Sequence, residues 1–528
     1  MFSDNTICRY CNYLPSDEYL CDPTSPNVCG PCKKLLEIES KVKEIRLMLV
    51  GLERERQQLK TQANQHHERM IHHLPPEISA EIFEKCLPRD LMDASLYDIS
   101  STEMIYAPLV ISSVCRTWRE LAFSVHRLWQ TLPLFSPKFS SLPHPASVKA
   151  WIERAGQLPL SIIFRIQAST SRRAGAVQVM GVLNQYSTRW AELRYEGPPT
   201  LFPHFPNDIS SLPELRKLCI ANSADFSDDN LRLYPTRLNI LSLSGLRISS
   251  VDINCSHLTH LRLEKVTLFE SFDALRRAPN LIDCVFGPVE DIDQEETNPF
   301  EATFLSLNTF SHISLQNLEI SPPLYKILFR RLSCPSLKAL TLDIGGDDEV
   351  EMAFIIEFLQ TSKCSLEKLT FVHDAYLFDS DILQIYKNIP TLQHLKLTKL
   401  GSFDSSATLF CYPLSDTSYL PALRSLSIEW PESYEDWPML PSIFGIGIYR
   451  EKMPYKNLRP ALKSVTVLAN RSLKLKGDEW ESGKFDIDED TVQKILWLRE
   501  ETGVQWSIKI GQSEADLIEL AVKHYGIS

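Results

Sequence analysis

The chain lacks the features that would place it in a membrane or send it for secretion. Among its 528 residues, no apolar run approaches the roughly 20 residues that a membrane-spanning helix needs. The N-terminus has no basic stretch followed by an apolar core, so no secretory signal is expected. The apolar fraction of 44% and the mean hydropathy of −0.14 are typical of a globular protein in water. We therefore expect a cytoplasmic or nuclear chain, whose cysteines stay reduced or bind metal.

The chain also lacks the motifs of common enzyme classes and an excess of positive charge. It contains no Gly-x-Gly-x-x-Gly, no phosphate-binding loop and no Gly-x-Ser-x-Gly. Its formal net charge is −12, and an acidic chain repels a phosphate backbone. We therefore expect no catalytic residues, no nucleic-acid partner and no membrane partner.

Residues 74–133 begin with a short helical pattern. Pro75 lacks an amide donor and fixes its own φ, so a new element is expected to begin there. Ile78, Ile82 and Phe83 then fall on one side of a helix and form a single apolar stripe. A short amphipathic helix is predicted directly after the proline.

The second half of the same stretch predicts another helix. Val110, Val114, Trp118 and Leu121 are spaced by four, four and three residues, which favours one amphipathic helix across all of them. Trp118 and Trp129 supply large apolar side chains to a unit that is too small to bury much surface alone. We expect a compact all-α module.

Together these segments resemble an F-box. The family pattern runs Leu-Pro-x-Glu-Ile, Ile-Phe, Leu-Pro, Val-Cys-(Lys/Arg)-x-Trp and Leu-Trp-x-x-Leu, and the chain carries each segment in that order. One departure is the link between the two helical patterns, residues 89–107, which is longer than is usual in the family and which we interpret as an exposed loop. The segments are Leu74-Pro75-Pro76-Glu77-Ile78, Ile82-Phe83, Leu87-Pro88, Val114-Cys115-Arg116-Thr117-Trp118 and Leu128-Trp129-Gln130-Thr131-Leu132.

The resemblance implies a function. F-box modules dock onto the Skp adaptor of cullin–RING ubiquitin ligases, and the rest of such a chain captures the protein substrate. A protein of this kind is a receptor and has no catalytic residues of its own. The positions that would line or support the adaptor contact are Leu74, Pro75, Ile78, Ile82, Phe83, Leu87, Val114, Cys115 and Trp118.

Residues 1–32 contain two cysteine pairs with the spacing of a zinc site. Cys8 and Cys11 form one pair, Cys29 and Cys32 form the other, and 17 residues separate the pairs. A segment this short has no apolar core, so a bound metal would supply its folding free energy. We expect a structural zinc knuckle, with Cys21 as a spare thiol or substitute ligand. The alternative is a disordered segment with incidental cysteines.

Residues 33–73 carry a heptad pattern. Its positions follow one another in unbroken steps of three and four, which indicates a helix with one apolar seam. The pattern is strong in its first half and weakens from Arg56 onward. It favours a homodimer through a parallel coiled coil of residues 35–59, and the alternative is a single helix that packs back on the chain. The seam positions are Leu35, Ile38, Val42, Ile45, Leu49, Leu52, Arg56, Leu59, Ala63, His66 and Met70.

Residues 188–528 contain an irregular internal repeat, and residues 134–187 lead into it. The unit is Leu-x-x-Leu-x-Leu, often preceded by proline, and it recurs every 20 to 39 residues. Each unit predicts a turn into a short strand, and helices are predicted between strands at 271–277, 352–360 and 381–388. The units start at Leu215, Leu238, Leu258, Leu281, Leu315, Leu337, Leu366, Leu392, Leu423 and Leu462, with Trp190 in a first member.

This region resembles a leucine-rich-repeat solenoid, in which stacked units bury one continuous core. It departs from the usual pattern because it lacks the buried asparagine after the strand and its repeat lengths are uneven. A helix over 488–501, a strand over 504–510 and a helix over 515–525 would cap the last unit. The alternative is an ordinary α/β domain with leucine-rich strands. The expected fold is thus α/β: a cysteine knuckle and coiled-coil helix, a small all-α F-box, then an irregular solenoid.

Three functional hypotheses follow from these patterns. The first is a substrate receptor of a Skp–cullin–F-box ubiquitin ligase, which binds the adaptor through the F-box and a protein substrate through the solenoid. The second is an interaction scaffold that uses the same surfaces outside any ligase. The third is a zinc-dependent DNA-binding regulator, which the acidic charge and the lack of six closely spaced cysteines with a basic run oppose. We expect the first.

Overall fold

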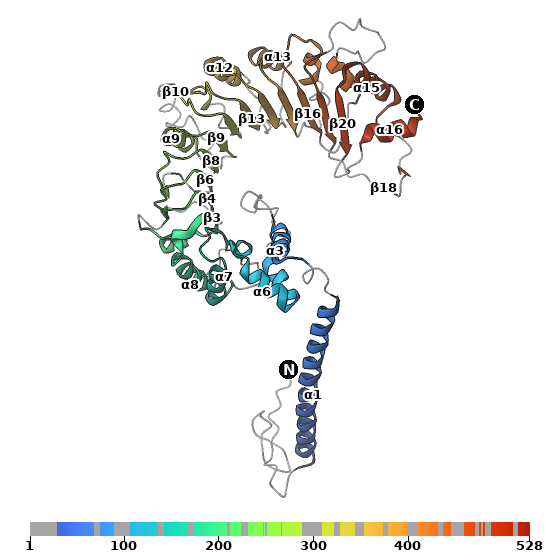
Figure 1. The fold of residues 1–528 in the computed structure, drawn as a ribbon. Helices are drawn as coiled ribbons and strands as arrows, with labels where there is room; N and C mark the ends of the chain where they lie inside the picture. Colours follow the sequence, from blue (N-terminus) through green and yellow to red (C-terminus); the bar gives the residue numbers. More distant parts are fainter. Residues whose placement is uncertain are drawn as a thin grey trace. The chain divides into compact units, whose positions relative to one another are not determined.

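The computed structural model divides into two compact units, Met1–Leu128 and Trp129–Ser528, each described here by itself (Figure 1). None of the helices among the described residues combines the length and the apolarity that a membrane crossing requires. The described residues are 29–67, 74–88, 106–135, 142–166, 173–208, 212–222, 231–246, 248, 251–265, 267–287, 309–321, 328–343, 353–372, 379–398, 410–430, 437–444, 459–469, 475–476, 479–480, 487–510 and 516–527.

The first unit is helical. A long helix, α1 (Gly30–His67), confirms the helix predicted from the heptad pattern as far as His67, and seam position Met70 lies outside the described residues. Its apolar seam side chains from Leu35 to Leu59 are exposed. Three shorter helices follow, α3 (Pro76–Lys85), α5 (Ala107–Val114) and α6 (Arg116–Ser124), and then a 3-10 turn, η1 (His126–Trp129).

The prediction of one continuous helix from Val110 to Leu121 is wrong. The chain breaks at Cys115, whose backbone is extended with φ −154° and ψ 178°. Its Sγ accepts a hydrogen bond from the amide of Trp118 at 3.4 Å, so Cys115 ends α5 and caps the start of α6. The apolar spacing could not reveal this break because cysteine is not among the residues usually preferred at a helix start.

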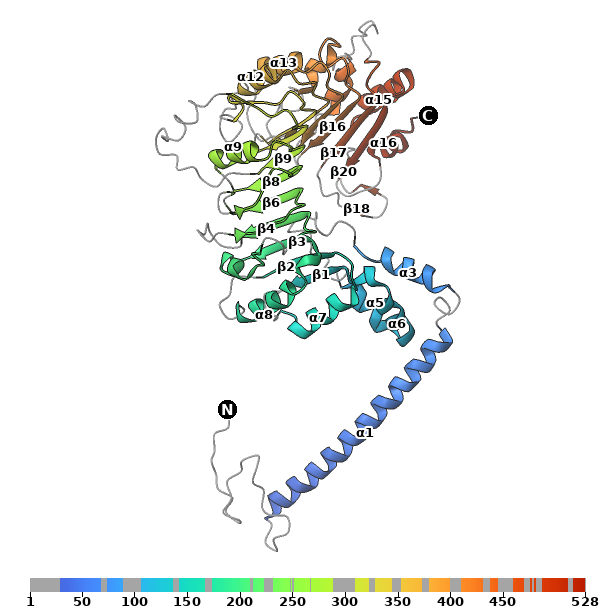
Figure 2. The ribbon, with the colours of Figure 1, turned by 60° about the vertical axis from the view of Figure 1, so that its left-hand side comes forward.

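The second unit is built on one parallel sheet of fourteen strands (Figure 2). The order of the strands in the sheet follows their order in the chain, so each strand pairs with the next sheet strand along the chain. The strands are β1 (Thr131–Phe135), β2 (Leu160–Arg165), β3 (Trp190–Gly197), β4 (Lys217–Asn222), β6 (Ile240–Ser244), β8 (His260–Glu264), β9 (Asp283–Phe286), β11 (Asn317–Ile320), β13 (Ala339–Asp343), β14 (Lys368–Val372), β15 (His394–Thr398), β16 (Ser425–Trp430), β17 (Ser464–Ala469) and β20 (Gln505–Ile510).

The strands predicted from the leucine repeat are confirmed in β3 and in every sheet strand from β4 to β17. The second and third apolar residues of neighbouring units pair in register: Leu218 lies opposite Leu241, and Ile220 lies opposite Leu243. These two ladders continue through all later strands and are buried. One continuous apolar core therefore lies behind the sheet, as in other proteins built from stacked units.

The sheet begins earlier than the repeat pattern indicates. β1 and β2 precede β3 in the same sheet, so β2 lies within the predicted linker 134–187, and the final Leu-Trp-x-x-Leu segment runs into β1. β2 was missed because its sequence, Leu-Ser-Ile-Ile-Phe-Arg, is buried at four of six positions and does not alternate. A continuous apolar run of this kind cannot be told from a buried helix by its periodicity.

Helices connect several of the strands, and Figure 1 shows α9, α12 and α13 on the same side of the sheet. The predicted helices between strands are confirmed as α9, α12 and α13. The predicted C-terminal helix, strand and helix are confirmed as α15, β20 and α16. The helices are α7 (Pro145–Arg154), α8 (Arg173–Asn184), α9 (Leu268–Arg277), α12 (Ala353–Ser362), α13 (Asp379–Asn388), α15 (Glu489–Thr502) and α16 (Leu517–Tyr525).

Shorter elements fill the connections. Three two-stranded pairs stand apart from the main sheet: β5 (Leu231–Arg232) with β7 (Val251–Asp252), β10 (Phe310–Ser311) with β12 (Leu332–Ser333), and β18 (Leu475–Lys476) with β19 (Glu479–Trp480). The 3-10 turns of this unit are η3 (Ser187–Arg189), η4 (Pro199–His204), η6 (Tyr412–Ser415) and η7 (Trp437–Phe444).

Candidate functional site

The helical module of the first unit has a small core centred on two aromatic rings. Phe83 of α3 is 2% exposed and lies against Trp118 of α6, with ring centres 4.9 Å apart. Ile111 of α5 and Ala122 of α6 are also buried. Because α3, α5 and α6 each contribute to this core, the module folds as a unit around the Phe83–Trp118 pair.

Polar contacts hold the helices of the module in place. Arg119 of α6 donates from Nε to the backbone carbonyl of Ser112 at 2.8 Å, which ties the end of α5 to α6. Arg127 of η1 lies 3.6 Å from the carboxylate of Glu84, which ties η1 to α3. Both contacts are partly exposed to water, so they add orientation more than stability.

The module leaves apolar side chains in contact with water. On α3, Ile78 and Ile82 lie one turn apart and are 45% and 36% exposed. On α5, Val110 and Val114 are also one turn apart and are 59% and 48% exposed. These exposed branched side chains on two neighbouring helices make this surface the candidate docking site of the module.

The nine adaptor positions predicted from the sequence therefore differ in their burial. Phe83 belongs to the core. Pro75, Ile78, Ile82 and Val114 are exposed. The half-buried positions are Leu74, Leu87, Cys115 and Trp118.

Three further exposed apolar residues are not among the nine predicted adaptor positions. Leu109 and Val110 of α5 are 45% and 59% exposed, and Phe123 of α6 is 37% exposed. The single-helix prediction placed Val110 on a buried stripe with Trp118, and the break at Cys115 removes that constraint. Correct recognition of the break would have shown that α5 has its own exposed side.

The predicted zinc knuckle lies mostly outside the described residues. Cys8, Cys11 and Cys21 are outside them, whereas Cys29 and Cys32 stand at the start of α1. Within the described residues, no group of three His, Cys, Asp or Glu side chains is placed to hold a metal ion.

Two cysteines of the second unit, Cys255 and Cys284, are buried and unreactive. Burial raises the pKa of the Cys284 thiol well above its ordinary value and also raises the pKa of Cys255. Both thiols are therefore protonated at neutral pH, and a protonated thiol is a poor nucleophile and a poor metal ligand. These side chains fill the core behind the strands.

The first half of the sheet carries charged side chains that are paired with each other. Arg165 and Arg194 each lie 3.1 Å from the carboxylate of Glu196. Arg262 lies 2.8 Å from Glu264 on the same strand, β8. The positive charges of this part of the sheet are thus neutralised within the sheet.

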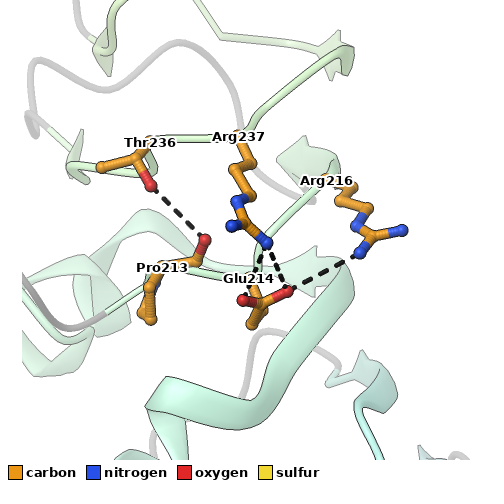
Figure 3. Close-up of polar contacts among 5 residues, drawn as sticks. All are labelled: Pro213, Glu214, Arg216, Thr236 and Arg237. Carbon is orange, nitrogen blue, oxygen red and sulfur yellow. Dashed lines mark hydrogen bonds and ion pairs between the residues drawn. The ribbon is translucent and has the colours of Figure 1, made fainter.

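The turns before β4 and β6 show the same arrangement (Figure 3). Arg237 donates from Nη1 to both carboxylate oxygens of Glu214, at 2.9 and 3.1 Å. Arg216 lies 3.6 Å from the same carboxylate, and Thr236 donates to the carbonyl of Pro213. One carboxylate therefore serves two arginines from neighbouring repeat units.

The second half of the sheet carries exposed positive side chains in a different arrangement. Lys368 of β14 and Lys396 of β15 are exposed on the face opposite the buried leucine ladders. Lys338, Arg424 and Lys463 are exposed in the turns just before β13, β16 and β17. We call these five residues the basic patch. Within the part of the chain that the structure describes, none of the five forms an ion pair.

The comparisons with known proteins give no family. No protein-family model matches the chain, and no curated protein matches it. A functional assignment therefore rests on the helical module, the long helix α1 and the two halves of the sheet.

Proposed function

We propose that the chain is a substrate receptor of a Skp–cullin–F-box ubiquitin ligase. The helical module of residues 74–128 is the F-box and binds the Skp adaptor, and through it the cullin. The observation that carries the proposal is the exposed pair Ile78 and Ile82 on α3, the helix whose Phe83 packs against Trp118 in the core. These residues lie in the segments that resemble the F-box pattern.

The second unit holds the protein substrate. Its consecutive parallel strands, uneven repeat lengths and continuous leucine ladders support an irregular leucine-rich-repeat solenoid with α15, β20 and α16 as its cap. The receptor acts by proximity and is not itself an enzyme. A target lysine that is held near a charged conjugating enzyme reacts in an effectively intramolecular step, which raises its rate without any catalytic group on the receptor.

The N-terminal segment adds a second contact. The exposed seam of α1, from Leu35 to Leu59, joins two copies of the chain in a parallel coiled coil. Cys8 and Cys11, together with Cys29 and Cys32 at the start of this helix, hold a structural zinc ion. A dimeric receptor binds a repeated target with higher avidity than a single copy does.

Co-purification of the Skp adaptor with the full chain tests the proposal. We expect stoichiometric adaptor with the parent chain and its loss in the double variant Ile78→Asp and Ile82→Asp, because charged side chains cannot be buried unpaired in an apolar interface. The matched control is Ile313→Asp. Ile313 is 69% exposed and lies outside the helical module, so this variant keeps the adaptor.

Circular dichroism of the double variant shows whether the module remains folded. A parent chain that retains no adaptor would exclude the receptor role. A chain that retains the adaptor but causes no turnover of any bound target would favour a scaffold outside the ligase cycle.

A further inference from the structure

The two halves of the main sheet differ in whether their positive side chains are paired with carboxylates. From β2 to β9, each arginine that projects from an open-face position has a carboxylate within 3.1 Å. From β13 to β17, the basic patch has no such partner within the described residues. Like charges on neighbouring strands repel each other, and an anion bound between them would relieve this repulsion.

The residues of the basic patch are close neighbours. Lys368 lies opposite His394 in the register of β14 and β15, and Lys396 is the second residue after His394. Strand geometry places the Cα atoms of Lys368 and Lys396 about 8 Å apart. In addition, the amide of Lys463 donates to the carbonyl of Arg424 at 2.8 Å, so the turns that hold these two cations are stacked.

The surroundings of the patch suit an anionic ligand. Thr370 of β14 and Ser427 of β16 flank Lys396 in the sheet register and present hydroxyl groups on the same face. Hydroxyls donate hydrogen bonds to carboxylates, and the mobile ammonium groups of lysine pair with them as point charges. Two carboxylates lie among the five cations: Glu367 beside Lys338 in the row of turns, and Glu429 of β16 diagonal to Lys396 on the open face. Cations therefore still outnumber carboxylates in the patch.

We propose that the basic patch binds an acidic segment of a protein partner, rich in Asp and Glu. The proposal rests on the proposed function, in which this segment belongs to the substrate that the receptor captures. Five strands span about 19 Å, which an extended peptide of about six residues covers. A short acidic peptide therefore matches both the charge and the width of the patch.

A nucleic acid fits the same patch less well. The chain carries a net charge of −12, and Glu319 and Asp343 stand on the same face beside the patch. A long polyanion would extend past the cations and meet Asp343 at the end of β13 and Glu319 on β11. A peptide with its charge confined to a few residues avoids this repulsion.

Fluorescence anisotropy with the full chain tests the proposal. The first probe is a fluorescein-labelled peptide of eight alternating Asp and Glu residues, and the second is a single-stranded oligonucleotide of matched charge. We expect the peptide to bind the parent, with an affinity that falls as salt rises. In the double variant Lys368→Glu and Lys396→Glu, we expect an affinity loss of about tenfold or more, since two attractive contacts become repulsive.

The matched control is the double variant Lys149→Glu and Lys523→Glu, which makes the same change in net charge at exposed lysines of α7 and α16. It should bind the peptide as the parent does. The milder variant Lys368→Gln and Lys396→Gln separates lost attraction from misfolding, and it should also weaken binding. Thermal unfolding followed by circular dichroism checks that each variant is folded.

Three results would overturn the proposal: no binding of the peptide to the parent, equal loss in the control variant, or tighter binding of the oligonucleotide at the same lysines. Adaptor co-purification is measured on the same samples. If the parent binds no peptide but retains the adaptor, only the proposal that the basic patch binds an acidic peptide is contradicted. Peptide binding without adaptor contradicts only the ligase role.

Discussion

The ring of Trp118 lies against the ring of Phe83 at 4.9 Å, with the two planes tilted by 40°. Phe83 is almost fully buried, while the indole Nε1 of Trp118 is buried and has no hydrogen-bond partner among the described residues. The pair therefore stabilises the helical module by apolar packing alone. It also fixes the side of α3 that faces inward, and this leaves Ile78 and Ile82 outward.

Removal of the Phe83 ring should unfold the module without affecting the sheet. We expect Phe83→Ala to cost about 3–5 kcal/mol, the range for a large buried aromatic side chain. The loss of stability is measured by amide hydrogen exchange, which should become faster in α3, α5 and α6. Ile78→Ala, at an exposed position of the same helix, is the control and should leave exchange nearly unchanged. Equal exchange in the two variants would mean that Phe83 is not a core residue.

Arg459 forms a buried junction between the repeat units of β16 and β17. The residue is only 4% exposed. Burial lowers the pKa of its guanidinium group to about 10, so Arg459 remains charged at neutral pH. Four backbone carbonyls replace the water that this charge has lost. They belong to Leu414, Asp416, Tyr419 and Leu420.

Replacement of Arg459 by methionine should destabilise the sheet unit strongly. The variant removes a donor from all four carbonyls. Those of Asp416 and Leu420 keep the amides of Tyr419 and Leu423, whereas those of Leu414 and Tyr419 lose the Arg459 donor, and a buried carbonyl left without a donor costs about 1–3 kcal/mol. We expect a loss of about 3 kcal/mol or more in the free energy of unfolding, seen as a lower urea midpoint. Arg424→Met is the control, because Arg424 is exposed and should change stability by less than about 0.5 kcal/mol. Similar midpoints for the two variants would contradict this role.

His312 makes the stability of the sheet unit depend on pH. Its Nε2 lies 3.1 Å from the carbonyl oxygen of Ala278 and donates to it, and its Nδ1 is buried without a partner among the described residues. Burial lowers the pKa of His312 below its ordinary value of 6.5, because the charged ring would be poorly solvated. The folded chain therefore binds fewer protons at this residue than the unfolded chain does.

The difference in bound protons makes the folded chain less stable as the pH falls. Stability from neutral His312 is fully present above pH 6.5 and is lost as the pH falls toward the folded-state pKa. We expect the parent to lose more stability between pH 7 and pH 5 than His312→Gln, which keeps an amide donor for Ala278 but does not titrate. Urea unfolding at both pH values measures the difference. Parallel pH profiles would show that His312 titrates with the same pKa in the folded and unfolded chains, and would contradict this role.

The repeat pattern predicted much of the sheet because strand burial alternates. Where every second residue is a buried leucine, as in Leu241 and Leu243, the strand and its inward side are both visible in the sequence. β2 carries Ile162, Ile163 and Phe164 in a row, all buried, so this alternation is absent and the strand was missed. The start of the sheet was therefore predicted too late.

The candidate sites were less predictable because they depend on contacts across elements. The exposure of Ile78 and the burial of Phe83 follow from the contact with Trp118, which is 35 positions further along the chain. The basic patch joins Lys338 to Lys463 across five strands, and no local motif connects them. Spacing within one segment can show a helix or a strand, but pairing of charges between segments depends on the register.

The long helix α1 offers the last prediction. Along its seam, Leu49 and Arg56 occupy equivalent positions in consecutive heptads, so a parallel coiled coil brings the two copies of Arg56 face to face. These arginines repel each other and weaken the dimer, whereas in an antiparallel pair they would lie far apart. We expect Arg56→Leu to strengthen self-association and Ile45→Asp to abolish it. Sedimentation of the full chain over a range of concentrations measures both effects, and Lys43→Asp, at an exposed position off the seam, should behave as the parent does. A parent that stays monomeric, or an Arg56→Leu variant with unchanged association, would mean that α1 does not form a parallel dimer.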